Sequence, residues 1–240
     1  MILLRHIFAA LICPLILLHL VSGFFWVGGA ALGSTRAGRA AATVWSRALL
    51  ILFGVRLHQN GKPLKGALCV ANHLSWLDIV ALKASFDACF LSKAEVKSWP
   101  IIGLVASWLG TLFIGRGANG AAERATQQIA ERLRAGETVI FFPEGRINQD
   151  RGLLPFRPRL FKAAYDAQAL VQPVAIRYLS ANGDLGHLVP EYNMLKSVWW
   201  LAGRRDVEVE ITFLEPLEPA DRPRRQIADE SRARVARALG

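Results

Sequence analysis

A histidine and an aspartate, five positions apart in "NHLSWLD", are of residue types that could handle a proton. His73 follows a short apolar run that predicts a buried strand, and the next segment has the apolar spacing of a helix. If Asp78 lies in the first turns of that helix, its carboxylate can reach back to one imidazole nitrogen. That bond would fix the tautomer and leave the other nitrogen to accept a proton.

The same stretch also has a simpler structural interpretation. Asn72 or Ser75 would cap the helix, His73 would be an ordinary hydrogen-bonded residue, and Asp78 would face solvent. Short motifs arise by chance too often for this one to decide between the two interpretations. The choice depends on the other motifs in the chain.

Three further motifs accompany predicted strands. "GTLFIGRG" places Arg116 between two glycines, where its guanidinium suits a two-point grip on a phosphate. "FFPEGR" puts Glu144, Gly145 and Arg146 in a turn. Glu144 is either a turn residue that bonds backbone groups or a ligand for substrate hydroxyls. Pro173, inside "VQPVAIRY", indicates an edge strand or a bulge that lines a pocket.

A sheet is needed to bring these motifs together. Short apolar runs alternate with helical stretches, which is typical of an α/β domain, and the motifs follow predicted strand ends, where such sheets build sites. A strictly alternating last strand is expected near an edge. We therefore predict a mixed sheet flanked by helices, with strands at 67–71, 88–92, 110–114, 138–142, 171–178 and 206–214, and helices at 75–86, 100–108, 119–135 and 156–168.

The N-terminal part is far more apolar than the rest. Residues 6–33 contain no Asp, Glu, Lys or Arg, and about 20 apolar residues span a bilayer core. A secretory signal peptide is the alternative, but the run is longer than the usual apolar region of such peptides. Residues 40–55 predict an amphipathic helix that lies in the interface or returns beside the first. We expect a membrane anchor over residues 1–58 and an α/β domain over 59–240.

Charge indicates which partners and which compartment to expect. The formal net charge of +10 suits nucleic acid or an anionic membrane. The sequence has no zinc spacing, aromatic RNA-binding motif or basic recognition helix, so we expect membrane lipids and no nucleic acid. Arg36, Arg39 and Arg47 should face lipid headgroups and place the catalytic domain on the cytoplasmic side of the cytoplasmic (inner) membrane. Three cysteines without a C-x-x-C pattern predict neither a disulfide nor a structural metal.

The C-terminal stretch "DRPRRQIADESRARVARAL" predicts a basic helix. Ile227, Val235 and Leu239 form a thin apolar stripe along it. We interpret it as a solvated surface helix, because runs of charge usually form solvated faces, and we assign it no chemistry.

Together, "NHLSWLD", "GTLFIGR", "FPEG" and "VQPVAI" resemble, in order and approximate spacing, the motifs of the glycerolipid acyltransferases. The likeness is greatest to the bacterial branch that acylates 1-acyl-glycerol-3-phosphate. It implies that His73 is the general base and Asp78 its orienting partner. It also implies that Arg116 contacts the acceptor's phosphate and that Glu144 and Gly145 help to bind the acceptor.

One motif departs from the family pattern. The family's third motif usually reads F-P-E-G-T-R or F-P-E-G-T-T, whereas here Arg146 directly follows Gly145 and Ile147 stands at the usual arginine position. Either Arg146 supplies the acceptor contact, or the acceptor differs from the usual one. The second alternative is open because the branch grades into relatives that acylate lyso-ornithine lipids.

The resemblance implies acyl transfer from acyl-CoA or acyl carrier protein to 1-acyl-glycerol-3-phosphate, giving phosphatidic acid in phospholipid biosynthesis, with no cofactor and no metal. A neutral imidazole would take the hydroxyl proton while donors hold the oxyanion. The first alternative is acylation of another lysolipid such as lyso-ornithine lipid. The second is a membrane-bound hydrolase in which His73 and Asp78 activate water or Ser75 is the nucleophile, and the third is a non-catalytic lipid-binding protein at the membrane surface. We discount a metal enzyme using His73, Asp78 and Glu144, because no second histidine lies near a predicted strand end.

Overall fold

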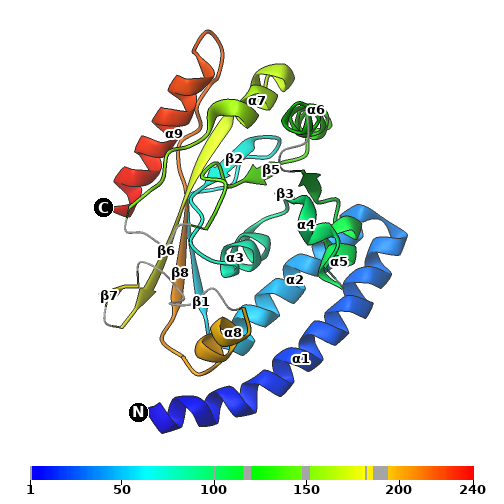
Figure 1. Ribbon diagram of the computed structural model, residues 1–240, viewed down its shortest axis with the longest axis vertical. Coiled ribbons are helices and arrows are strands. Elements are labelled where there is room, and N and C mark those ends of the chain that lie inside the picture. Colours follow the sequence, from blue (N-terminus) through cyan, green and yellow to red (C-terminus); the bar gives the residue numbers. More distant parts are fainter. Residues whose placement is uncertain (1, 100, 116–119, 148–151, 182, 186–193) are drawn as a thin grey trace. The chain divides into compact units, whose positions relative to one another are not determined.

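The computed structural model describes residues 2–99, 101–115, 120–147, 152–181, 183–185 and 194–240 (Figure 1). The chain folds into two compact units and passes between them several times. The first unit takes residues 1–59, 74–86 and 177–211, and the second takes residues 60–73, 87–176 and 212–240. The predicted division of the chain at residue 59 stays a prediction.

The first unit is mainly helical. It also contains the C-terminal part of strand β6 and most of strand β8. Its other elements are α1 (Ile2–Gly33), α2 (Thr35–Phe53), β1 (Arg56–Asn60), α3 (Leu77–Ser85), β7 (Gly183–Asp184) and α8 (Met194–Ala202).

Helices α1 and α2 form a hairpin, so the predicted amphipathic segment returns beside the apolar one (Figure 1). The rings of His19 and Trp45 stack with centroids 5.0 Å apart, and the Trp45 Nε1–H donates to the His19 carbonyl at 3.0 Å. A Cβ at Gly23 would lie 2.0 Å from the Trp45 ring, so glycine allows the helices this close approach. Arg47, which we expected to face headgroups, donates from Nε to the Ala84 carbonyl of α3 at 2.8 Å.

Helix α1 is long and apolar enough to cross a membrane, judged by length and composition alone. Among the described residues, it is the one helix that meets this test. Large apolar side chains such as Leu17, Leu18 and Phe25 are exposed along it. In water that exposure would be unfavourable, so α1 has the surface expected of a lipid-facing helix.

The second unit carries the parallel strands and the helices that cover them. It contains the N-terminal part of β6 (Val171–Ser180) and the end of β8 (Glu208–Phe213). Its other elements are β2 (Leu68–Ala71), β3 (Cys89–Lys93), α4 (Ala94–Lys97), α5 (Ile102–Trp108), β4 (Leu112–Ile114), α6 (Ala121–Arg134), β5 (Val139–Phe141), the 3₁₀ helix η1 (Pro158–Phe161), α7 (Lys162–Ala167) and α9 (Arg224–Leu239).

Strand pairing confirms the predicted mixed sheet. The order is β1-β8-β6-β2-β5-β3-β4, with β7 paired antiparallel to β6. The pairs β6–β2, β2–β5, β5–β3 and β3–β4 are parallel. Val70 of β2 is in register with Phe141 of β5, so these two strands end at the same edge of the sheet. The segments that carry His73 and Glu144 therefore leave the sheet side by side.

The strand predicted to lie near an edge is β8, which adjoins the terminal strand β1. The edge prediction for Pro173 is wrong, because β6 lies between β8 and β2. Pro173 pairs with Val70 on one side, and its carbonyl accepts the Leu214 N–H at 3.0 Å on the other. Leu214 follows the last residue of β8, so the missing proline N–H faces a place where regular strand pairing stops.

Helices α6, α7 and α9 share one hydrophobic core with the strands of the second unit. Ile129 of α6, Phe161 of η1, and Ile227 and Val235 of α9 are fully buried in it. The interpretation of the C-terminal helix as a purely solvated element is therefore wrong, because its thin apolar stripe belongs to this core.

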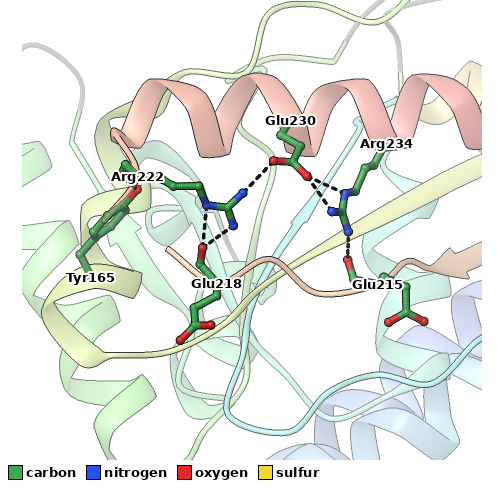
Figure 2. Close-up of polar contacts among 6 residues, drawn as sticks. All are labelled: Tyr165, Glu215, Glu218, Arg222, Glu230 and Arg234. Carbon is green, nitrogen blue, oxygen red and sulfur yellow. Dashed lines mark hydrogen bonds and ion pairs between the residues drawn. The ribbon is translucent and has the colours of Figure 1, made fainter. Parts of the chain in front are cut away.

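A carboxylate between two arginines fixes α9 to the preceding loop (Figure 2). Glu230 accepts from Arg222 Nη1 at 2.8 Å and from Arg234 Nη2 at 2.6 Å. The same arginines also donate to the backbone carbonyls of Glu218 and Glu215. The two arginines thus bind both a side chain of α9 and backbone carbonyls of the loop, and these bonds hold the helix against the loop.

We predict that Glu230→Gln lowers the thermal unfolding midpoint by roughly 2–4 °C, which corresponds to about 1 kcal/mol for a chain of this size. The reason is that two arginines would lose the carboxylate between them. Asp229→Asn is the matched control on the same helix, because the partner of Asp229 in the described part of the chain is the exposed Arg225, at 3.9 Å. An equal effect of the two substitutions in thermal unfolding would contradict the role given to Glu230.

Candidate active site

Asn72 fixes the chain where β2 ends. Its side chain Nδ2 donates to the Ile176 carbonyl at 2.9 Å, and its Oδ1 accepts the Ile176 N–H at 2.8 Å. Asn72 is fully buried, so both halves of its amide are paired within the protein. Asn72 therefore does not cap a helix. It joins the residue before His73 to strand β6.

His73 is half-buried and is held at two places. Its ring stacks on Phe142, with centroids 3.9 Å apart and planes 11° from parallel. Its backbone N–H donates to Glu144 Oε1 at 2.9 Å. The stack occupies a face of the imidazole, so this contact fixes the ring without using either nitrogen.

Glu144 is a buried carboxylate, with 2% of its surface exposed. Its Oε1 accepts the His73 N–H, and its Oε2 accepts the Leu154 N–H at 3.1 Å. The two alternatives for Glu144 were a turn residue and a substrate ligand, and these bonds support the first. Its partners are distant in sequence, however, so Glu144 joins three separate segments of the second unit.

Gly145 and Arg146 complete the turn after β5. Gly145 has a φ of 76°, a left-handed conformation that favours glycine, and its N–H donates to the Phe142 carbonyl at 3.1 Å. A Cβ at Gly145 would lie 3.3 Å from the Arg157 guanidinium. Arg157 is thus a cation beside the turn that sequence reasoning missed. Arg146 is exposed.

Asp78 belongs to the first unit and is fully buried, so its interpretation as a solvated helix residue is wrong. Its Oδ2 accepts the backbone N–H groups of Leu74 and Ser75 at 2.7 and 2.9 Å. Its Oδ1 accepts from the Tyr178 hydroxyl at 2.5 Å. The carboxylate lies in the first turn of α3 and fixes the peptide that directly follows His73. Its expected bond to an imidazole nitrogen of His73 stays a prediction.

Tyr178 is the functional candidate that the sequence motifs did not single out. It is fully buried on β6, and its hydroxyl meets Asp78. Burial raises the pKa of Tyr178 well above its ordinary value, and the negative charge of Asp78 raises it further. The hydroxyl therefore stays protonated and acts as a donor to Asp78 at physiological pH. A sequence signal existed, because period-two alternation places this tyrosine on the same face as buried Val174 and Ile176.

The structure brings together some of the predicted site residues. His73, Glu144 and Gly145 meet within the second unit, whereas Asp78 is described in the first. Arg116 lies outside the described residues. In the described part of the chain, no three His, Cys, Asp or Glu side chains are grouped as metal ligands.

Comparison with known proteins identifies a matching family model and related chains. The family model described as "Acyltransferase" matches residues 54–177. A 1-acyl-sn-glycerol-3-phosphate acyltransferase of Neisseria gonorrhoeae is 37% identical over 152 residues, which are 62% of this chain and 59% of the relative. A lyso-ornithine lipid O-acyltransferase of Pseudomonas aeruginosa is 36% identical over 179 residues, which are 74% of this chain and 69% of the relative.

The matches differ in how much of each chain they cover and in sequence identity. The chain spans 46–59% of the length of the first three curated relatives that it matches. The crystal structure of the 1-acyl-sn-glycerophosphate (LPA) acyltransferase PlsC from Thermotoga maritima has a TM-score of 0.67 and covers 98% of this chain and 95% of its own. At 20% identity, that structure establishes a shared fold.

We predict that Tyr178→Phe lowers the free energy of unfolding by about 1.5–3 kcal/mol, the usual contribution of a hydrogen bond to a charged group. Chemical unfolding of the detergent-solubilised chain measures this loss. Tyr165→Phe is the matched control, because the Tyr165 hydroxyl donates to a neutral acceptor, the Arg222 carbonyl, at 2.6 Å. That variant should lose only about 0.5–1.5 kcal/mol. A smaller loss for Tyr178→Phe than for the control would contradict the charged bond.

Proposed function

Because the chain belongs to the acyltransferase family, we propose that it transfers an acyl group from a thioester carrier to the free hydroxyl of a lysolipid. The first candidate for the acceptor is 1-acyl-glycerol-3-phosphate, which would give phosphatidic acid as the product. Acyl-CoA or acyl carrier protein is the donor and leaves as the free thiol. The observation that carries this proposal is His73, with its ring stacked on Phe142 and its backbone bound to the buried Glu144.

His73 acts as the general base. Its imidazole takes the proton of the acceptor hydroxyl as that oxygen attacks the thioester carbonyl. The new C–O bond forms, the C–S bond breaks, and the proton passes to the leaving thiolate. The reaction needs no acyl-enzyme, and the chain has no G-x-S-x-G element to supply a serine nucleophile.

Asp78 is the proposed orienting partner of His73. A base must present one nitrogen in the right tautomer, and a carboxylate bound to the other nitrogen achieves this in known His/Asp pairs. Support comes from the surroundings of Asp78: it is fully buried and accepts three hydrogen bonds, two of them from the backbone just after His73. A carboxylate held in this way does not change its position during turnover.

Acceptor binding is assigned to Arg116, Glu144, Gly145 and Arg146. Glu144 contributes by fixing the turn through its bonds to the His73 and Leu154 N–H groups. Arginines suit a phosphate because the planar guanidinium offers two parallel donors. Arg157, next to Gly145, adds a positive charge to the turn that the sequence motifs did not indicate. Binding of the acceptor's phosphate beside this turn would leave its free hydroxyl for His73.

Lyso-ornithine lipid is the second candidate acceptor, and two observations favour it. Ile147 occupies the position at which the family usually carries an arginine. Four relatives named lyso-ornithine lipid O-acyltransferase align with 55–84% of this chain, against 49–62% for two relatives named 1-acyl-sn-glycerol-3-phosphate acyltransferase. Both acceptors require the same base and the same type of donor.

The protein is proposed to act at the cytoplasmic membrane, with the catalytic residues on the cytoplasmic side. Helix α1 has the length and composition of a membrane span, and the basic residues that follow it suit the cytoplasmic face. Both the lysolipid and the product are membrane lipids, so an anchored enzyme meets its acceptor in the bilayer.

We predict that Arg116→Ala raises the KM for lysophosphatidic acid about ten- to a hundredfold, because a charge-assisted contact to phosphate is lost. The KM for the acyl donor should stay unchanged. Initial rates with the purified chain in vesicles, with acyl-CoA and with acyl carrier protein as donors, measure both values. The KM for lyso-ornithine lipid, which carries no phosphate, should hardly change on this substitution.

Arg146→Ala serves as the internal comparison. If Arg146 compensates for Ile147, it should show a smaller effect of the same kind. If Arg146 is only a turn residue, it should show none. A wild type that acylates only lyso-ornithine lipid would overturn the first acceptor, and a wild type that acylates no lysolipid would overturn acyl transfer itself.

A further inference from the structure

We propose that Arg232 of α9 is a positioning residue for His73. It acts through the peptide group between Leu153 and Leu154 and through the carboxylate of Glu144. All these residues belong to the second unit. The inference rests on the proposed function only in giving His73 the role of the base.

The peptide group between Leu153 and Leu154 lies between a cation and an anion. Arg232 Nη2 donates to the Leu153 carbonyl at 2.6 Å, and Arg232 Nε donates to the Leu154 carbonyl at 3.0 Å. The Leu154 N–H, which belongs to the same peptide group as the Leu153 carbonyl, donates to Glu144 Oε2 at 3.1 Å. The guanidinium and the carboxylate thus bind opposite ends of one peptide dipole.

This arrangement makes the two bonds mutually supportive. A guanidinium on the carbonyl withdraws electron density from the peptide and makes its N–H a stronger donor to the carboxylate. Glu144 is buried, so it depends on such donors in place of water. Its other oxygen accepts the His73 N–H at 2.9 Å. A weaker Leu154 bond would hold the carboxylate less firmly and so loosen its bond to the backbone of His73.

Helix α9 holds Arg232 in a fixed position. Ile227 and Val235 on the same helix are fully buried, and Arg222 of the preceding loop binds Glu230 of the helix at 2.8 Å. The loop that carries Leu154 is fixed a second time, because the Arg157 N–H donates to the Pro143 carbonyl at 3.0 Å. The sequence motifs assigned no function to the C-terminal helix. The contacts of Arg232 make this helix part of the structure that positions His73.

The experiment compares Arg232→Gln with Arg234→Gln in the full chain reconstituted in vesicles. Both arginines lie on α9 and both bind backbone carbonyls, since Arg234 Nη1 donates to the Glu215 carbonyl at 2.9 Å. Arg232→Gln should lower kcat about tenfold, as expected for loss of a charge-assisted contact, with the KM of both substrates unchanged. Arg234→Gln should leave kcat unchanged. Arg232→Lys, which keeps the charge but loses the fork, should recover part of the rate.

A double-mutant cycle tests the route through Glu144. In a Glu144→Gln background the Arg232→Gln substitution should cause little further loss of kcat, because the carboxylate through which it acts is gone. Full additivity of the two effects would overturn the proposal. So would an equal loss of kcat in Arg232→Gln and Arg234→Gln, which would show a general effect of helix stability.

Hydrogen exchange supplies a readout that does not depend on activity. Arg232→Gln should speed amide exchange in the peptides that contain His73 and Leu154, whereas Arg234→Gln should not. Unchanged exchange at both sites would overturn the link. If the wild type transfers no acyl group but exchange responds as expected, the proposed function fails and the link to His73 stands. If acyl transfer occurs but exchange and kcat do not respond, the link alone fails.

Discussion

The buried carboxylate of Glu144 is the constraint on which the segments around His73 and Leu154 depend. A charge that leaves water is costly unless donors replace the lost hydration. Two of the donors are backbone N–H groups, from His73 and Leu154, at 2.9 and 3.1 Å. The bonds that stabilise the buried carboxylate therefore also fix these two segments, because neither can move away without taking a donor from it.

Asp78 is held in the same way, as a buried carboxylate that accepts backbone N–H groups. This carboxylate is also buried, and it binds the backbone N–H groups of Leu74 and Ser75 and the hydroxyl of Tyr178. The raised pKa of Tyr178 keeps that hydroxyl a donor. Each compact unit thus uses one acidic residue of a motif to fix the backbone on one side of the peptide bond between His73 and Leu74. Rigidity of this kind is what a general base needs, because proton transfer tolerates little misplacement.

Local pattern was enough to predict six strands, the apolar N-terminal helix and the strand-end positions of His73 and Glu144, but it missed the strands β1 and β7. The family resemblance added their expected roles, and the family model and relatives confirm membership. Long-range pairing was not predictable: Pro173 left an edge strand or a bulge open because its missing N–H is a local property, whereas its neighbours β8 and β2, which exclude the edge, come from distant parts of the chain. Tyr178 and Arg232 were missed for the same reason, since their polar partners lie about 80 to 100 residues away.

The most direct test of the account is single-turnover acyl transfer by His73→Ala. This substitution removes the imidazole but keeps the backbone N–H that Glu144 binds, so the thermal unfolding midpoint and vesicle association should not change. The rate should fall by about 10²–10⁴, the usual cost of losing a general base. His58→Ala, which removes a half-exposed histidine bonded to Glu208, should keep the wild-type rate. Near wild-type acyl transfer by His73→Ala would contradict the account.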